Sequence, residues 1–316
     1  MHPAYSVIVF TTASGAGYGL LIWLAVAMTL NLVPREEMLG LFGMGVALAL
    51  ITIGLLTSTA HLGRPERAWR AFSQWRTSWL SREGVAAVVT YMPAGVLGLG
   101  WVFGELVPGQ IGLGAGLSIP CALVTIWCTG MIYASLPTIR AWHQPLVAPV
   151  YIVLALATGG VLMSLLLAIF GYDARWIALA NILGSALGWF LKARYWIAID
   201  TARKTYTAEA ATGLGRFGTV RPLDPPHTQP NFVMREMGYQ VARRHAGRLR
   251  GLSVLLLFAL PMLGALPMLV NLPAPIRIVA AALSVVSAVI GVFTERWLFF
   301  AEAEHVVMLY YRGGVA

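Results

Sequence analysis

The segment LVAPVYIVLALATGGVLMSLLLAIF, residues 146–170, decides the fold class. It contains no charged residue, and a helix of about 20 consecutive apolar residues is long enough to span a bilayer. Its apolar residues are continuous, whereas the strands of a transmembrane barrel alternate between apolar and polar positions. The segment is therefore predicted to be a membrane-spanning helix.

Seven further stretches share this length and hydropathy. Together the eight predicted spans cover residues 6–32, 38–61, 83–106, 111–137, 146–170, 175–199, 251–271 and 275–300. The composition agrees, because 58% of the 316 residues are hydrophobic and 11% are charged, against about 25% charged in a soluble domain. The expected fold is an all-α membrane protein, a bundle of eight transmembrane helices forming a single domain over residues 1–316.

The basic residues are distributed unevenly across the predicted membrane. An even number of spans puts both termini on one side, called side A, with the connectors after spans two, four and six. Side A receives 19 of the 22 Lys and Arg residues, counting Lys192, Arg194 and Arg296 in the last turns of their spans. Basic residues beside spans mark the cytoplasmic face, so both termini are predicted to lie on the cytoplasmic side.

The sequence lacks the usual motifs for bound redox cofactors. Its two cysteines, Cys121 and Cys128, form no Cys-x-x-Cys pattern, so no iron–sulfur cluster is expected in this chain. A transmembrane pair of haems needs histidines near both faces, but all six histidines fall at side A. No haem is therefore expected, and a single haem between His61 and His143 is the alternative.

Carboxylates near mid-membrane, which an ion pathway requires, are nearly absent. Those in or beside the spans fall near span ends: Glu83, Glu105, Asp173, Asp200 and Glu295. This distribution weakens the alternative of a secondary transporter, which needs buried ions or broken helices. A purely structural anchor stays open, because its loops can also be basic and aromatic.

The connector at residues 62–82 is basic and aromatic, with five arginines and three tryptophans. Pro65 suits the first position of a short helix. Arg67 and Arg70 would then share one face and aromatic residues another, which is typical of an amphipathic helix in the headgroup region. These two arginines are also candidates for docking a soluble partner. Ser81 is predicted to cap the following span.

His61 closes span two, and Glu83 lies in the first predicted turn of span three, so both occupy similar depths on side A. An imidazole and a carboxylate at the hydrocarbon edge suit proton exchange with a quinone, whose reduction takes up two protons with two electrons. Tyr91, two turns after Glu83, could offer a hydroxyl. Arg64, which could neutralise a charged ligand, and Tyr133 are weaker candidates. The ordinary alternative is anchoring at the membrane interface.

The run HLGRPERA at residues 61–68, followed by LSRE at residues 80–83, resembles the signature of the dimethyl sulfoxide reductase membrane-anchor family. The opening HPAYSV, residues 2–7, and the eight-span layout are also similar, so the resemblance covers essentially the whole chain. It implies a haem-free anchor in the bacterial inner membrane that exchanges electrons with ubiquinone or menaquinone. The implied partners are an iron–sulfur subunit and a molybdopterin catalytic subunit, and the family's quinol-binding histidine and glutamate match His61 and Glu83.

This family includes reductases that consume quinol and a sulfite-oxidising branch that delivers electrons to quinone. Dimethyl sulfoxide reductases generally carry their catalytic arm outside the cytoplasm. The charge count places side A, with its docking loops, in the cytoplasm, which favours the sulfite dehydrogenase branch. The alternative is the quinol-oxidising anchor of a dimethyl sulfoxide reductase-type enzyme.

The long side-A connector, residues 200–250, interrupts the hydropathy with four prolines and then a basic stretch containing Arg243 and Arg244. Binding to anionic lipid headgroups explains such a stretch without further assumptions. Docking of a soluble subunit through Arg243 and Arg244 is the functional alternative. Nucleic-acid binding is not expected, because the positive-inside rule already accounts for basic residues beside spans.

Overall fold

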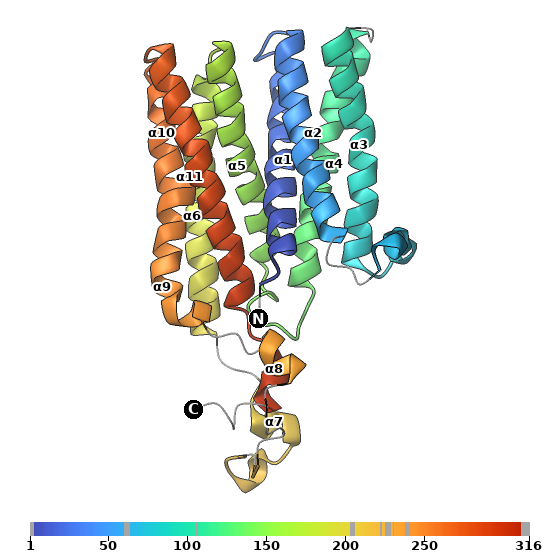
Figure 1. Cartoon of the computed structure of the whole chain (residues 1–316), viewed down its shortest axis with the longest axis vertical. Coiled ribbons are helices and arrows are strands. Elements are labelled where there is room, and N and C mark those ends of the chain that lie inside the picture. The colour runs from blue at the N-terminus through green and yellow to red at the C-terminus, as the bar shows by residue number, and fades with distance from the viewer. Residues whose placement is uncertain are drawn as a thin grey trace.

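The computed structural model describes residues 3–59, 64–104, 107–202, 206–221, 223–224, 229, 231–237 and 241–310, without the side chains of 241–244 and 310. Eight long apolar helices run side by side through it (Figure 1). Seven are continuous: α1 (Tyr5–Thr29), α2 (Glu37–Thr59), α3 (Trp79–Phe103), α4 (Pro108–Ala134), α5 (Val147–Phe170), α6 (Arg175–Thr201) and α11 (Ala274–Ala301). The prediction of an all-α bundle with eight spans is confirmed, and the described residues contain no strand.

The seventh span combines three consecutive elements. These are α9 (Val241–Val254), a π-helical segment at Leu255–Ala259 and α10 (Leu260–Leu269). A π turn displaces backbone carbonyls from regular α-helical bonding, and a bilayer offers no water to satisfy them. Ser287 on α11 donates its hydroxyl to the Leu256 carbonyl at 2.5 Å. The α11 backbone also approaches closely, because a Cβ at Gly291 would lie 2.5 Å from the Leu257 nitrogen.

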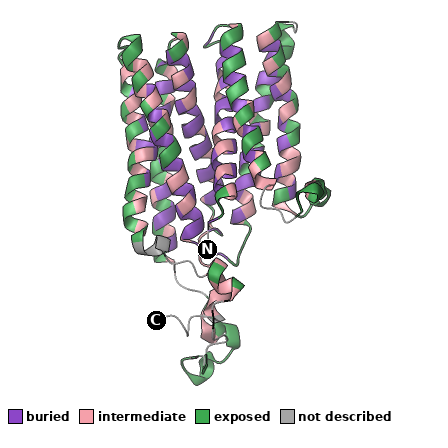
Figure 2. Cartoon of the chain, viewed as in Figure 1, coloured by how far each residue is buried: buried purple, intermediate pink, exposed green. Residues whose placement is uncertain are grey.

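The bundle has two groups of helices that meet at α1 and α5 (Figure 1). On one side lie α2, α3 and α4, and on the other lie α6, α10 and α11. Figure 2 shows burial concentrated on the facing sides of the helices, whereas many outward-facing residues are exposed, as lipid contact requires. The crossing of α1 and α5 depends on glycine, since a Cβ at Gly19 would overlap the Ala155 carbonyl, and one at Gly159 would overlap Gly19.

Small-residue spacing alone does not identify helix contacts in this protein. The pair Gly112 and Gly116 on α4 has the spacing of a packing motif, yet a Cβ at either position would meet no atom within 4 Å. By contrast, a Cβ at Gly188 on α6 would lie 2.7 Å from the Phe258 ring. Close approach therefore occurs at Gly188 but not at Gly112 or Gly116, although all three have the same spacing to another glycine.

Side A is the end of the bundle where α1 begins and α11 ends (Figure 1). The short elements gather at this end: η1 (Pro65–Gln74), α7 (Ala208–Thr212), η2 (Gly215–Phe217), α8 (Phe232–Met237) and η4 (Val306–Tyr310). Within the long connector, α9 begins at Val241, before the predicted start of its span. The basic stretch of residues 241–250 is therefore helical and continuous with the seventh span.

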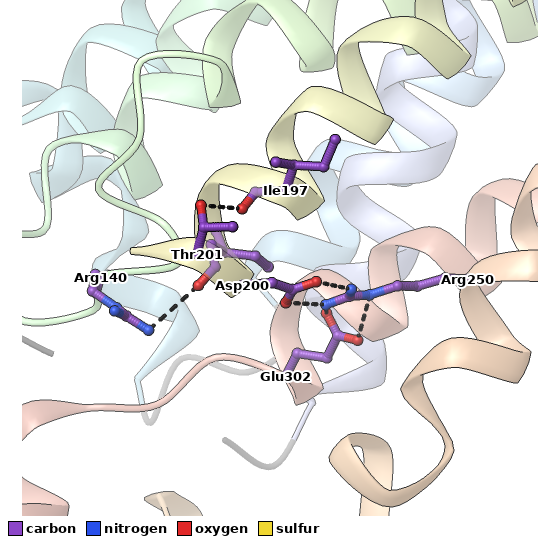
Figure 3. Close-up of polar contacts among 7 residues, drawn as sticks. Arg140, Ile197, Asp200, Thr201, Arg250 and Glu302 are labelled. Atoms are coloured by element: carbon purple, nitrogen blue, oxygen red, sulfur yellow. Dashed lines mark hydrogen bonds and ion pairs between the residues drawn. The ribbon is translucent and has the colours of Figure 1, made fainter. Parts of the chain in front are cut away.

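Two arginines brace the side-A end of the bundle (Figure 3). Arg250 on α9 pairs with Asp200 at 2.6 Å and with Glu302 at 3.1 Å, which ties α9 to the carboxyl ends of α6 and α11. Arg140, between α4 and α5, donates to the carbonyls of Ile199 and Ala202, and so caps the carboxyl end of α6. These two cations serve internal contacts and are not free for partner docking.

Candidate functional site

Part of the segment between α2 and α3 forms a short helix, η1, at the side-A end of the bundle. It begins at Pro65, as predicted, but η1 is a 3₁₀-helix, in which side chains three apart lie in line. Trp69 and Phe72 therefore share one row, and Trp75 follows immediately after η1 at the same spacing. The Trp69 and Trp75 side chains are 66% and 53% exposed, which suits insertion of their rings into the membrane interface.

The junction between η1 and α3 differs from the predicted one. Ser78, not Ser81, caps α3, because its side-chain oxygen accepts from the Ser81 nitrogen at 3.4 Å and the helix begins at Trp79. The Ser81 hydroxyl instead donates to the Ala71 carbonyl. Arg82 donates to the carbonyls of Trp75 and Arg76 at 3.0 and 2.6 Å. These contacts fix the interfacial segment to the start of α3.

Glu83 lies inside the bundle rather than in the first turn of α3. Its position four residues after Trp79 corresponds to a depth of about 6 Å along the helix. The residue is 4% exposed, and one carboxylate oxygen accepts the Thr129 hydroxyl of α4 at 3.0 Å. Among the residues that the structure describes, Glu83 has no cationic partner. An ionisable residue of this kind within a span is a candidate functional group.

The other predicted quinone-site residues fall in different surroundings. His61 lies outside the described residues, and Arg64 is exposed just before η1. The Tyr91 hydroxyl pairs with that of Thr52 at 2.6 Å and so bridges α3 to α2. The predicted partner-docking residues Arg67 and Arg70 are exposed on η1. Arg243 and Arg244 belong to the backbone of α9, but their side chains lie outside the description.

Tyr133 is buried inside the bundle rather than exposed on its surface as an interfacial anchor would be. It is 7% exposed and lies one turn after Thr129, inside an aromatic cluster at the side-A end. Its ring stacks on Tyr151 at 5.8 Å between centroids and meets Trp142 and Phe299 edge-on at 5.2 and 5.5 Å. The structure therefore brings Tyr133 toward α5 and α11, while Thr129 on the same helix contacts Glu83.

A lipid-facing groove of about 420 Å³ runs between α3 and α4. Arg82 and Trp75 lie at one end of it, and Cys128 lies on its α4 wall. The remaining lining is largely apolar: Val85, Ala86, Val89, Pro120, Cys121 and Val124. Glu83 and Thr129 each follow a groove residue in the sequence, Arg82 and Cys128, but do not themselves line the groove.

A second buried polar cluster was missed from sequence. Lys192 of α6 pairs with Glu295 of α11 at 2.5 Å, and Arg296 Nε lies 2.6 Å from the other Glu295 oxygen. Their exposures are 1%, 0% and 3%. The assignment of Lys192, Arg194 and Arg296 to last turns is therefore wrong, because neither α6 nor α11 has a basic residue in its last turn, and Lys192 lies about 13 Å before the end of α6.

Aromatic rings line the positive charges of this cluster. The Arg296 guanidinium lies 4.0 Å from the Tyr151 ring centre, and the Lys192 ammonium lies 4.2 and 4.9 Å from the rings of Tyr195 and Trp196. Cation–π contacts are strongest where water is excluded. The rule that ionisable residues inside a membrane pair with one another was the available signal, since spans six and eight each carry such groups.

Comparison with known proteins identifies the relatives of this protein. The family model described as "DMSO reductase anchor subunit (DmsC)" matches residues 1–301. The chain belongs to this family of membrane anchors. The C subunit of the sulfite dehydrogenase of Allochromatium vinosum is 32% identical over 333 positions, covering 99% of each sequence. The C polypeptide of the anaerobic dimethyl sulfoxide reductase of Escherichia coli is 29% identical over 137 positions, covering 42% of the present sequence and 45% of its own.

Family membership confirms the resemblance inferred from residues 61–68 and 80–83. As a DMSO reductase-type anchor, the chain is a multi-pass membrane protein of a complex with catalytic and electron-transfer partners. The fold supports this assignment directly, because the anchor family and the eight apolar helices cover nearly the same residues.

Proposed function

We propose that this protein is the quinone-reactive anchor of a molybdenum and iron–sulfur oxidoreductase, passing electrons from sulfite oxidation to the quinone pool. The partners would be an iron–sulfur electron-transfer subunit and a molybdopterin catalytic subunit. The similarity to the anchor-family member of a sulfite dehydrogenase over 99% of both sequences supports the sulfite branch. The shorter match to a polypeptide of an anaerobic dimethyl sulfoxide reductase supports the alternative, in which the same site oxidises quinol.

The buried carboxylate of Glu83 is the observation that carries the proposal. Quinone reduction consumes two protons with two electrons, so its site needs a group that can accept and release protons away from bulk water. Glu83 has one hydroxyl donor, Thr129, and no cation to hold it permanently ionised among the described residues. It is therefore free to change protonation state as the reaction requires.

The groove between α3 and α4 fits a quinone in its chemistry. Its volume of about 420 Å³ falls in the range of small-molecule sites, and its apolar walls suit an isoprenoid tail entering from the bilayer. At the side-A end, Arg82 and Trp75 supply a cation and an aromatic ring to the groove, and Arg82 directly precedes Glu83 in the sequence. We infer that the groove guides the ligand and that Glu83 exchanges the protons.

Side A is proposed to face the cytoplasm of a bacterial inner membrane. The charge asymmetry supports this orientation, and a cytoplasmic docking face matches a sulfite-oxidising partner. Alkaline phosphatase fused after residue 310, on side A, should be inactive. A fusion at residue 33, in the connector between α1 and α2 at the opposite end of the bundle, should be active. The reverse pattern would reject the orientation and favour the quinol-oxidising alternative.

The Glu83→Gln variant tests the quinone role. In the assembled complex, sulfite-to-quinone turnover should fall at least about a hundredfold, while turnover with an artificial dye that accepts electrons from the soluble subunits stays normal. Glu37→Gln, an exposed carboxylate at the opposite end of the bundle, is the matched control and should change neither rate. Normal quinone turnover in Glu83→Gln would refute the role, and loss of both rates would indicate failed assembly.

A further inference from the structure

The long connector before the seventh span extends beyond the side-A end of the bundle. Its described residues within 206–237, called the projecting segment, include α7, η2 and α8. Figure 1 shows α7 and α8 beyond the ends of the eight long helices. When those helices cross a bilayer, a segment in this position lies outside the hydrocarbon and in water. The projecting segment is therefore a water-exposed surface and not part of the spans.

The projecting segment exposes large apolar side chains. Phe217 and Phe232 are 74% and 75% exposed. Three further exposed side chains of this kind belong to the same segment: Tyr206, Leu214 and Leu223. Exposed leucine and phenylalanine are ordinary where lipid covers them, but several on one segment in water indicate an interaction surface. Aromatic side chains in particular supply the anchors of protein–protein interfaces.

Local contacts fix the shape of the segment around Phe217. The Thr207 side chain caps α7 by accepting a backbone hydrogen bond at 3.2 Å, and Gly213 ends this helix with a φ of 68°. The Glu209 carboxylate accepts from the Val220 nitrogen at 3.2 Å, which closes the chain around η2. The Phe217 ring is therefore presented on a closed loop, which reduces the conformational entropy lost when a partner binds.

Charge distinguishes the projecting segment from the basic stretch that follows it. Residues 206–237 have no net charge, since three arginines balance three carboxylates: Arg216, Arg221, Arg235, Glu209, Asp224 and Glu236. Residues 241–250 are basic and contain no carboxylate, and they belong to α9, which continues into the seventh span. Anionic lipid headgroups attract basic residues at the membrane edge, but this attraction does not act on a neutral, apolar surface beyond it. The projecting segment therefore suits a protein partner, and α9 suits lipid.

The position of the proposed quinone site indicates which protein partner this is. Arg82 and Trp75 line the groove at its side-A end, so electrons exchanged with a quinone there must pass through side A. The subunit that carries them has to lie at the same end of the bundle, because electron transfer slows steeply with distance. Among the catalytic and electron-transfer partners of this family of anchors, the electron-transfer subunit meets that requirement.

We propose that the projecting segment docks the soluble iron–sulfur electron-transfer subunit, with Phe217 and Phe232 as its apolar anchors. This inference rests on the proposed function, which supplies the identity of the partner. Arg216, whose guanidinium lies 4.6 Å from the Phe217 ring centre, lies at the polar edge of this contact. The arginines of α9 contact lipid headgroups and are not needed for docking.

The test measures how much iron–sulfur subunit stays with the anchor. Complexes solubilised from membranes are purified through a tag on the anchor, and mass spectrometry quantifies the iron–sulfur subunit per anchor. In the double variant Phe217→Ser and Phe232→Ser, retention should fall at least about tenfold, because a few interface aromatics carry much of the binding energy. The double variant Phe217→Leu and Phe232→Leu, which keeps the surface apolar, should retain most of the subunit.

Normal retention in the serine variant would overturn the proposal. Native mass spectrometry of the same sample would then show whether a second anchor chain or bound lipid is lost instead. Because both phenylalanines are exposed, the serine variant should unfold at the same temperature as the natural anchor. Phe103→Ser is the matched control, since Phe103 is 65% exposed near the opposite end of the bundle, and it should leave retention unchanged.

Charge reversal and salt test the alternative of docking through α9. The double variant Arg243→Glu and Arg244→Glu should retain the iron–sulfur subunit at normal yield. Washing the natural complex with about 1 M sodium chloride, where exposed charges are screened within about 3 Å, should also leave the subunit in place. Loss of the subunit in the arginine variant, or its release by salt, would assign docking to basic residues and overturn the proposal.

The readouts separate this inference from the proposed function. If Glu83→Gln keeps normal quinone turnover, the quinone role of Glu83 fails, while the retention measurements still decide the docking surface. If Glu83→Gln blocks quinone turnover but the serine variant keeps its subunit, the quinone role stands and the docking surface is wrong. Excess purified soluble subunits should restore turnover in the serine variant by mass action, and a rate that stays low would contradict a docking role.

Discussion

Two buried carboxylates in the side-A half of the bundle have opposite surroundings. Glu83 and Glu295 are 4% and 0% exposed, and each lies within two turns of its helix end. Glu295 contacts two cations, Lys192 and Arg296, at 2.5 and 2.6 Å. Glu83 accepts a single neutral hydroxyl from Thr129. Burial alone therefore does not distinguish a structural carboxylate from a reactive one.

The difference lies in how firmly the surroundings fix the charge. Two adjacent cations hold Glu295 as an anion, so its ionisation is part of the folded structure. A lone hydroxyl donor can serve either form of Glu83, since the threonine oxygen can also accept a hydrogen bond from a neutral carboxyl. We therefore expect Glu295 to act in stability and Glu83 in chemistry, and three substitutions test this division.

Glu295→Gln should have the largest effect on stability. Removing the anion leaves Lys192 and Arg296 buried beside each other without compensation, at a cost of about 3–5 kcal/mol. The unfolding temperature of the detergent-solubilised complex should fall strongly, and less protein should accumulate in the membrane. The same substitution at Glu83 should cost about 1 kcal/mol. Equal losses of stability in Glu295→Gln and Glu83→Gln would contradict the division into a structural and a reactive carboxylate.

Thr129→Val should have an intermediate effect that depends on pH. The substitution removes the donor to Glu83, and an unsatisfied buried carboxylate costs about 1–3 kcal/mol. The loss should grow as pH rises, because the ionised form needs the hydrogen bond more than the neutral form. Unfolding measured across a pH series checks this expectation, with Thr129→Ser as the control that keeps the hydroxyl. A loss independent of pH would show that Glu83 does not titrate.

Arg250→Gln should have the smallest effect. Arg250 also contacts two carboxylates, as shown in Figure 3, but its own side chain is 19% exposed and that of Asp200 is 55% exposed, whereas that of Glu302 is 9% exposed. Partly hydrated ion pairs contribute about 0–1 kcal/mol and weaken with added salt. The difference in unfolding temperature between this variant and the natural protein should shrink as salt is raised. A loss of stability as large as that of Glu295→Gln would show that the difference in hydration does not explain the difference in stability between the two ion clusters.

The architecture was predictable because it rests on local properties of the sequence. Apolar runs of sufficient length locate all eight spans, although their ends differ by several residues. The start of α3 shows why ends are harder, since Ser78 and Ser81 are both suitable caps and only tertiary contacts choose between them. The Ser81 hydroxyl donates to the Ala71 carbonyl, and the Ser78 side chain caps the helix instead.

The candidate site was only partly predictable. Glu83 could be singled out because a carboxylate at the edge of a span is unusual and because the surrounding motif resembles a known family. Its partner Thr129 could not be identified, since threonines are common in spans. The sequence of α3 or of α4 alone also does not predict which of their residues come into contact. The pairing of Lys192 with Glu295 likewise depends on which helices are neighbours, so the sequence placed these charges near span ends without bringing them together.

The π-helical segment of the seventh span also limits how this membrane protein adapts to its bilayer. Ser287 satisfies the displaced Leu256 carbonyl, and Gly291 fits directly against the Leu257 backbone. Sliding α11 along the seventh span would break the hydrogen bond and bring larger side chains against the backbone. A thinner or thicker membrane must therefore be accommodated by tilting α11 and the seventh span together, without a change in their relative positions.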